Sequence, residues 1–160
     1  MTNRITSEIS SLIGKKYGPF KVFIESGAIE KFADAIGDEN TEHQGQNAIA
    51  SPTFPTTFRP KEPFPDFPQD YGDVGLHASQ TYEYKRPIVA GDEIDVTMTI
   101  SNIYQKDGKS GELVFMERDY SFMDSKTDEK IGSAKWVTLR RFNKWIFKKI
   151  KKCQILQKNL

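Results

Sequence analysis

Residues 92–105 read DEIDVTMTISNIYQ, and their alternation of apolar with polar side chains decides the fold class. If the chain is extended here, one face carries only apolar residues: Ile94, Val96, Met98 and Ile100. A period of two is typical of an antiparallel strand with one face buried and the other in water. The stretch therefore predicts a sheet whose apolar face needs a covering layer.

Three further stretches are rich in β-branched and aromatic residues: 76–89, 111–124 and 130–142. The connections KDGKS and SKTDEK are good hairpin sequences. A short strand is predicted at residues 21–25. The expected order is one strand, a helix, an irregular segment and then four strands in a meander.

Two helices are predicted before the sheet. Residues 5–13 place apolar side chains at helical spacing and stop at Gly14. Ser26 suits the N-cap of a second helix with one apolar stripe, formed by Ile29, Phe32, Ala33 and Ile36. Gly37 suits the left-handed position that ends a helix.

Residues 51–75 contain six prolines, which forbid any long helix. A turn or two of helix is still compatible with residues 53–58. Four phenylalanines lie among these prolines, so the segment is expected to pack against the core.

The bulk composition indicates one domain of an ordinary water-soluble type, with 160 residues, 37% apolar and 28% charged. No apolar run is long enough to span a membrane, and residues 1–11 lack the apolar core of a secretory signal. The expected compartment is the cytoplasm. The single Cys153 excludes an internal disulfide and a multi-cysteine zinc site, and two histidines give little support to any metal site.

The charge is divided unevenly along the chain. Eight Lys or Arg residues and no acidic residue follow Leu139, which leaves 15 basic and 22 acidic residues before it. We therefore expect one domain over residues 1–142 and a basic tail over 143–160. An amphipathic helix is predicted for the tail from apolar residues at helical spacing: Phe142, Trp145, Ile146, Ile150, Cys153 and Leu156. The alternatives are a frayed, solvated end and a segment that docks on an acidic partner or on anionic lipid.

The second predicted helix leads into GDENTEHQGQ, residues 37–46, where Asp38, Asn40 and His43 lie within six residues. Two interpretations are open. Asp and Asn are common in turns because they bond their own backbone, and a single loop histidine usually faces solvent. The same residues could instead transfer protons, since the reference pKa of histidine lies near neutrality.

A sheet that wraps a helix is the hot-dog architecture, and three blocks of sequence resemble the MaoC-like dehydratase family, especially its N-terminal-type hot-dog domains. The blocks are FADAIGDENTEH, IASPTFPTTF and LHASQTYEYKRPIVAGDEI, and the resemblance spans roughly residues 10–141. The family's motif is Gly-Asp-x-Asn-Pro-x-His, and Thr41 stands here in place of its proline. The segment QGQNAIA, after the motif histidine, is shorter than in the family, which predicts a more open or differently walled pocket.

This resemblance implies an α+β hot-dog fold, with an antiparallel sheet of about five strands around a central helical segment. It also implies an (R)-specific 3-hydroxyacyl-thioester dehydratase, equivalently an enoyl-thioester hydratase, acting on acyl-CoA or acyl carrier protein. The catalytic residues would be Asp38 and His43, supported by Gly37 and Asn40. Substrate contacts would fall at Pro52, Thr53 and Phe54, and backbone N–H groups around Thr53 and Phe54, at the start of the short helix, would receive the thioester oxygen.

We expect no cofactor, no metal and no nucleic-acid partner. The resemblance implies a homodimer, or a heterodimer with another hot-dog subunit. The alternative function is a non-catalytic hot-dog subunit that binds the acyl thioester for a catalytic partner, and a weaker third one is thioesterase-like chemistry. For His77, the only other histidine, we expect a structural or interface role.

Overall fold

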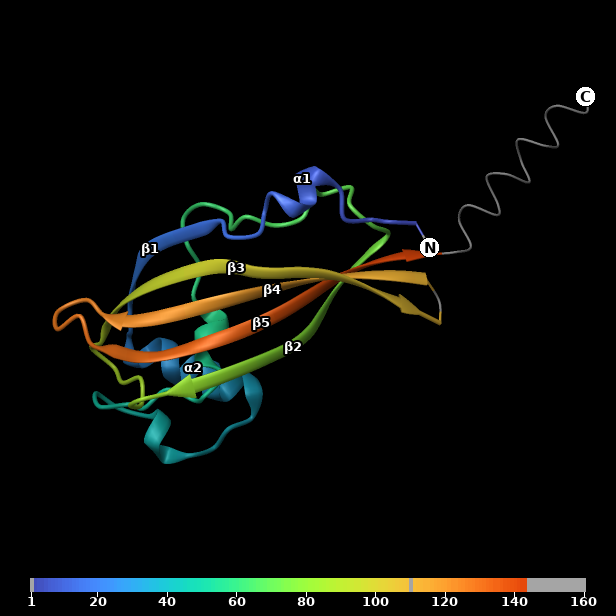
Figure 1. The fold of residues 1–160 in the computed structure, drawn as a ribbon. Coiled ribbons are helices and arrows are strands. Elements are labelled where there is room, and N and C mark those ends of the chain that lie inside the picture. The colour runs from blue at the N-terminus through green and yellow to red at the C-terminus, as the bar shows by residue number, and fades with distance from the viewer. Residues whose placement is uncertain (1, 110, 144–160) are drawn as a thin grey trace, which may run out of the picture.

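A computed structural model of the chain describes residues 2–109 and 111–143, which form one curved antiparallel sheet with two of its helical elements, α2 and η2, on the inner side (Figure 1). The helices are α1 (Ser7–Ser10), α2 (Ser26–Ile36) and the 3-10 turns η1 (Thr41–His43) and η2 (Phe54–Thr57). The strands are β1 (Lys16–Phe23), β2 (Val74–Tyr84), β3 (Glu93–Gly108), β4 (Gly111–Asp124) and β5 (Lys130–Asn143).

The strand order is β1-β3-β4-β5-β2, so the predicted four-stranded meander is correct for β3, β4 and β5 and wrong for β2. Short hairpin connections force β3, β4 and β5 to be neighbours. Between β2 and β3 the chain has no such hairpin, and residues 85–92 carry it from one side of the sheet to the other. β2 pairs instead with β5, antiparallel, at the edge.

The inner face of the sheet is the core, as the alternation in residues 92–105 predicts. The four side chains of the predicted stripe are 0% exposed: Ile94, Val96, Met98 and Ile100. Burying a side chain of this size contributes about 1.5–3 kcal/mol to stability. The sheet is therefore held mainly by what covers this face.

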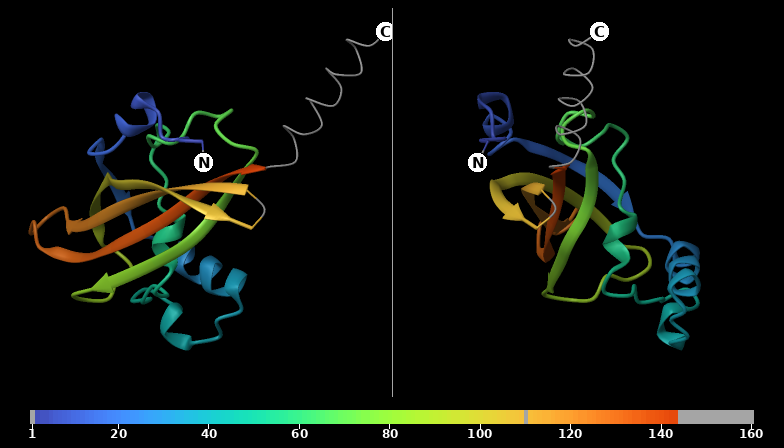
Figure 2. Two further views of the ribbon diagram at one scale, coloured as in Figure 1. Left: turned by 45° about the vertical axis from the view of Figure 1, so that its right-hand side comes forward. Right: turned by 90° about the vertical axis from the view of Figure 1, so that its right-hand side faces the viewer.

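Two helical elements cover this face. η2 lies against the sheet, and α2 lies against η2. The right-hand view of Figure 2 shows the sheet curving around η2, with α2 on the far side of η2. A line of nearly perpendicular aromatic rings joins these layers, at centroid distances of 5.5, 5.8 and 5.8 Å, in the order Phe32, Phe54, Phe58 and Phe122. This arrangement is the predicted α+β hot-dog fold.

Several predicted boundaries need correction. Only residues 7–10 of the first predicted helix are α-helical, and the first strand begins at Lys16, earlier than predicted. Glu25, and not Ser26, is the N-cap of α2, although it makes no capping bond through its side chain. Gly37 ends α2 with φ 69°, as predicted, because a residue without Cβ adopts this left-handed conformation readily.

Apart from η2, residues 51–73 have no helix or strand, as the prolines predict. The stretch after η2 is fixed to the rest of the fold at separate points. The Arg118 guanidinium on β4 pairs with Asp66 at 2.6 Å, and the Tyr71 hydroxyl donates to the carbonyl of Arg4 at 2.8 Å. Phe67 is buried in the core, so this segment is part of the packed domain.

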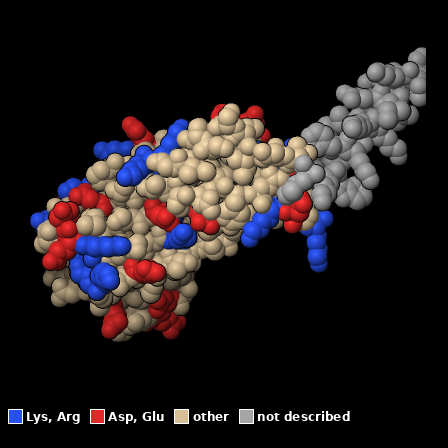
Figure 3. Space-filling model, viewed as in Figure 1, with Lys and Arg blue, Asp and Glu red and all other residues tan. Residues whose placement is uncertain are grey.

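Basic and acidic side chains are interspersed over the face drawn in Figure 3. Phe142, the first residue of the predicted amphipathic helix, lies in β5, so the helix does not begin there, and its other residues lie outside the described ones. Within residues 2–109 and 111–143, no helix has both the length and the apolar character that a membrane span requires.

Candidate active site

The loop that leaves α2 folds back on itself through its own polar side chains. Asp38 Oδ1 accepts a hydrogen bond from the N–H of Asn40 at 3.2 Å, and Asn40 Oδ1 accepts one from the N–H of Glu42 at 3.1 Å. The second bond caps η1, whose last residue is His43. Asx turns of this kind return the chain within a few residues, so His43 lies beside Asp38.

Asp38, His43 and Ser51 form a triangle of polar atoms. His43 Nε2 lies 2.9 Å from Asp38 Oδ2, and the Ser51 hydroxyl lies 3.2 Å from each of these two atoms. His43 is 5% exposed and Ser51 2%, whereas the Asp38 side chain is 34% exposed. A solvent-facing loop histidine is therefore excluded, and Asp38 is the member of the triangle that solvent reaches most easily.

The position of the protons on His43 follows from its second nitrogen. Nδ1 lies 2.6 Å from the carbonyl oxygen of Ile49, which can only accept, so Nδ1 carries a proton. Nε2 is then the nitrogen that gains and loses a proton. When protonated it donates to Asp38, and when neutral it accepts from the hydroxyl of Ser51.

The surroundings favour the ion pair over the neutral pair. The Ile49 carbonyl, and after it Asp38, raise the pKa of His43 above its ordinary value of 6.5, although burial opposes the rise. The N–H of Asn40, and after it His43, lower the pKa of Asp38 below its ordinary value of 3.8. Compared with the free side chains, the loop therefore favours an imidazolium beside a carboxylate, which is an acid next to a base.

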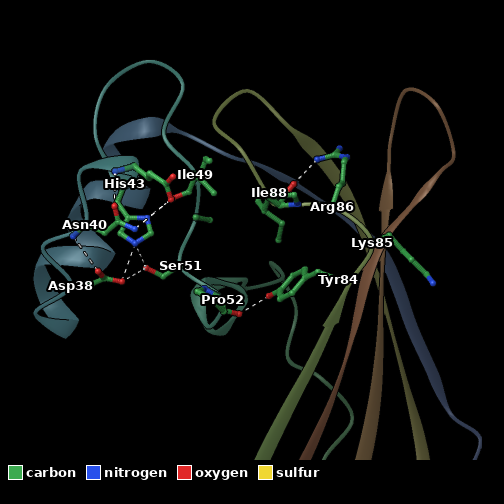
Figure 4. A pocket seen from close by; sticks show the side chains of 13 residues that line it. Asp38, Asn40, His43, Ile49, Ser51, Pro52, Tyr84, Lys85, Arg86 and Ile88 are labelled. Carbon is green, nitrogen blue, oxygen red and sulfur yellow. Dashed lines mark hydrogen bonds and ion pairs between the residues drawn. The ribbon is translucent and has the colours of Figure 1, made fainter.

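The triangle lies at one wall of a cavity of about 500 Å³ (Figure 4). Residues from the loop, from the chain leading to η2 and from the end of β2 onward line this cavity: Asp38, Asn40, Glu42, His43, Ile49, Ala50, Ser51, Pro52, Tyr84, Lys85, Arg86, Pro87 and Ile88. Cavities of this size that combine apolar walls with a few convergent polar groups are typical small-molecule sites. The Tyr84 hydroxyl closes part of the wall by donating to the carbonyl of Pro52 at 2.6 Å.

The structure thus places Asp38, Asn40, His43 and Pro52 on one cavity, whereas Thr53 and Phe54 are not among its lining residues. Phe54 is 3% exposed and packs in the core, and its N–H donates to the Ser51 carbonyl at 2.9 Å. This bond occupies the N–H that was expected to receive a thioester oxygen. Gly37 lies at the end of α2 and acts through the backbone.

Among the lining residues that sequence reasoning missed are Ile49, Ser51 and Tyr84, which bond to other residues of the site. Ile49 and Ser51 belong to the quoted block IASPTFPTTF, but only the fold shows that a carbonyl and a hydroxyl there reach His43. Tyr84 is the last residue of β2. Its long-range bond to Pro52, within the same chain, leaves no periodic signal in the sequence.

A second cavity, of about 550 Å³, lies between the segment after η2 and the sheet, with His77, Arg118 and Trp136 among its lining residues. It contains none of the predicted catalytic residues. Across the described residues, no group of three or more His, Cys, Asp or Glu is arranged to hold a metal ion.

Known proteins resemble the chain in sequence and in fold. A family model described as "FAS1-like, dehydratase domain region" matches residues 11–131. A UPF0336 protein of Streptomyces coelicolor is 35% identical in an alignment of 108 residues, and the match covers 58% of this chain and 71% of that protein.

Two solved structures share the fold. One is a chain of the C-terminally truncated HadBC (3R-hydroxyacyl-ACP dehydratase) complex of Mycobacterium tuberculosis, with TM-score 0.62 and 14% identity over 80% of this chain and 96% of that one. The other is described as a MaoC-like dehydratase, with TM-score 0.65 and 17% identity over 83% of this chain and 43% of that one.

The family match covers most of the chain, and it includes α2, the loop of residues 37–46, η2 and strands β1 to β4. The structural likenesses independently give the hot-dog fold. The chain therefore belongs to the FAS1-like dehydratase domain family, and it is a MaoC-like hot-dog domain.

Proposed function

We propose that the chain is an (R)-specific 3-hydroxyacyl-thioester dehydratase, equivalently an enoyl-thioester hydratase, acting on acyl-CoA or acyl carrier protein. The observation that carries the proposal is the contact between Asp38 and His43 at the wall of an apolar cavity. Membership of a dehydratase-domain family supports the reaction class. The (R) specificity comes from the likeness of the motif to the MaoC-like hydratases.

In the hydration direction, the Asp38 carboxylate takes a proton from water while the water oxygen bonds to Cβ of the enoyl thioester. The imidazolium of His43 gives its Nε2 proton to Cα, so one water has been added across the double bond. Asp38 is then neutral and Nε2 is free. Because Asp38 Oδ2 and His43 Nε2 are 2.9 Å apart, the proton passes from Asp38 to His43 and restores the ion pair. Dehydration is the reverse sequence.

The hydrogen bonds around Asp38 and His43 hold both side chains in the positions that this cycle requires. The Ile49 carbonyl holds Nδ1, so Nε2 faces the cavity in every step, and Ser51 orients both reacting groups. Reaction at Cα also places negative charge on the thioester oxygen, which needs a donor. We assign this role to the N–H of Thr53, next to the cavity residue Pro52, because the N–H of Phe54 is engaged.

We further propose that the chain works as a dimer with a second hot-dog subunit, identical or different. In the part of the chain that the structure describes, no strand pairs with the outer edge of β2, and Leu76 on that strand is 47% exposed. Such an edge readily pairs with another chain. HadBC, which shares this fold, is itself a complex.

The test is an assay of crotonyl-CoA hydration. The reaction is monitored through the loss of ultraviolet absorbance of the conjugated thioester. The purified chain is assayed alone and with candidate hot-dog subunits encoded near it. Activity that depends on Asp38 supports the proposal. Activity that appears only with a partner and survives loss of Asp38 would make the chain the non-catalytic subunit.

A further inference from the structure

The three residues 48–50 lie between the catalytic loop and the turn that follows β2, and they bond to both. Toward the loop, the N–H of Ile49 donates to the Glu42 carbonyl at 2.7 Å, and the Ile49 carbonyl accepts from His43 Nδ1 at 2.6 Å. Both backbone groups of one residue thus face the catalytic loop. The position of His43 depends on where residues 48–50 are held.

The neighbours of Ile49 bond in the opposite direction, as alternation along an extended chain requires. The N–H of Ala50 donates to the carbonyl of Ile88 at 2.8 Å, and the N–H of Ala90 donates to the carbonyl of Ala48 at 2.9 Å. Together they form an isolated antiparallel bridge centred on Ile49. Because of this bridge, the position of residues 88–90 determines the position of residues 48–50 and, through them, of the catalytic loop.

One side chain fixes the turn that contains residues 88–90. The Arg86 guanidinium lies 2.7 and 3.1 Å from the two oxygens of Asp92, 2.9 Å from an oxygen of Asp124 and 2.9 Å from the carbonyl of Pro87. Asp92 also accepts from the N–H of Val89 at 3.0 Å. The guanidinium therefore spans both ends of the turn.

The two carboxylates are themselves anchored. Asp124 ends β4, and its second oxygen accepts from the N–H groups of Lys126 and Thr127 at 2.9 and 3.2 Å. The side chains of Asp92 and Asp124 are only 11% and 18% exposed. Arg86 thus ties the turn to the rigid end of the sheet. Lysine does not reproduce this arrangement, because it lacks the planar fork with which a guanidinium bridges two carboxylates.

We propose that Arg86 is a positioning residue for catalysis: through the turn at residues 88–90 and the bridge to 48–50, it holds the Ile49 carbonyl against Nδ1 of His43. The inference rests on the proposed function. Figure 4 shows Arg86 on the wall opposite His43, so it acts on the histidine only through these backbone bonds. Its bonds to Asp92, Asp124 and Pro87 also make it a poor ligand for the phosphate of a thioester carrier.

The experiment compares Arg86→Met and Arg86→Lys with Lys135→Met in the full chain. Lys135 pairs with Glu117 and Asp119 at 3.3 and 3.4 Å, so its variant loses two carboxylate contacts without touching the site. The tautomer and pKa of His43 are read by ¹⁵N NMR, where the groups acting on its ring are Asp38, Glu42, Ser51 and the Ile49 carbonyl. Crotonyl-CoA hydration is measured in parallel.

In Arg86→Met we expect the pKa of His43 to fall toward 6.5, because the Ile49 carbonyl is no longer held against it, and both tautomers to appear. The value of kcat should fall about tenfold to a hundredfold, the usual consequence of a small misplacement, with KM little changed. Arg86→Lys should lie between Arg86→Met and the wild type. Lys135→Met should match the wild type in the tautomer and pKa of His43 and in kcat and KM.

An unchanged tautomer and pKa in Arg86→Met would overturn the proposal, whatever happens to stability. A raised KM with an unchanged pKa would make Arg86 a substrate ligand instead. If Arg86→Met does not fold, Asp124→Asn, which removes one of the two anchors, gives the same NMR readout. A wild type with no hydratase activity would count against the proposed function, while the NMR result would still decide whether Arg86 positions His43.

Discussion

Phe58 tests how the central segment is held inside the sheet. It is 4% exposed, and its ring packs nearly perpendicular to Phe54 and Phe122, each at a centroid distance of 5.8 Å. Replacing a buried phenylalanine by alanine costs about 3–5 kcal/mol, and each aromatic pair contributes about 0.5–1.5 kcal/mol beyond its buried area. With two such pairs, Phe58→Ala should lie in the upper part of that range.

The assay is thermal and urea unfolding followed by circular dichroism. For a chain of this length about 2–4 °C accompanies each kcal/mol, so Tm should fall by about 8–20 °C. Phe115→Ala is the matched control. Phe115 is half-buried on the other face of the sheet, stacked on Tyr104 at 4.9 Å, and should cost only about 1 kcal/mol. Equal losses in the two variants would refute the role of η2 as the central packing element.

Three further predictions concern the site and the sheet edge. Ser51→Ala should lower crotonyl-CoA hydration by about tenfold to a hundredfold and leave the chain folded, since Asp38 and His43 still bond each other; an unchanged rate would remove Ser51 from the site. The raised pKa of His43 stabilises the fold below pH 6.5, and this stabilisation is lost as pH rises through the folded-state pKa. Between about pH 6 and about pH 9, the unfolding free energy of His43→Gln should therefore fall less than that of the wild type, as urea titrations would show. Parallel curves of unfolding free energy against pH for the two proteins would contradict this. Leu76→Lys should shift the chain toward monomer in sedimentation, because a charge on an edge strand opposes pairing, and an unchanged assembly would place the interface elsewhere.

Local periodicity was enough to predict most of the sheet. Residues 111–124 were predicted as a strand with the bounds that β4 has, and residues 130–142 differ from β5 by one residue. The position of β2 could not be predicted, because its partner β5 lies about fifty residues later and both strands have the same alternating pattern. Pairing between distant strands depends on which hairpins close first and on the layer they cover.

The candidate site was also predicted only where it depends on residues that are close in the sequence. Asp38 and His43 belong to one short loop, so the sequence brings them close, and their contact agrees with the motif. The burial of His43 and its bonds to Ile49 and Ser51 depend on the bridge to residues 88–90, which no local pattern reveals. The role expected of the Phe54 N–H fails because a turn with Ser51 uses that group first.

The central claim is that Asp38 and His43 catalyse the addition of water to an enoyl thioester. The most direct measurement is the kcat/KM of crotonyl-CoA hydration for the wild type, Asp38→Asn, His43→Ala and the control Glu39→Gln. Glu39 is an exposed carboxylate next to Asp38 that is not among the residues lining the cavity.

Positioned acid and base groups each contribute about a hundredfold to ten-thousandfold, so both site variants should lose at least about a hundredfold. Glu39→Gln should retain the wild-type rate. The claim would be contradicted by Asp38→Asn and His43→Ala proteins that are folded and as active as the wild type.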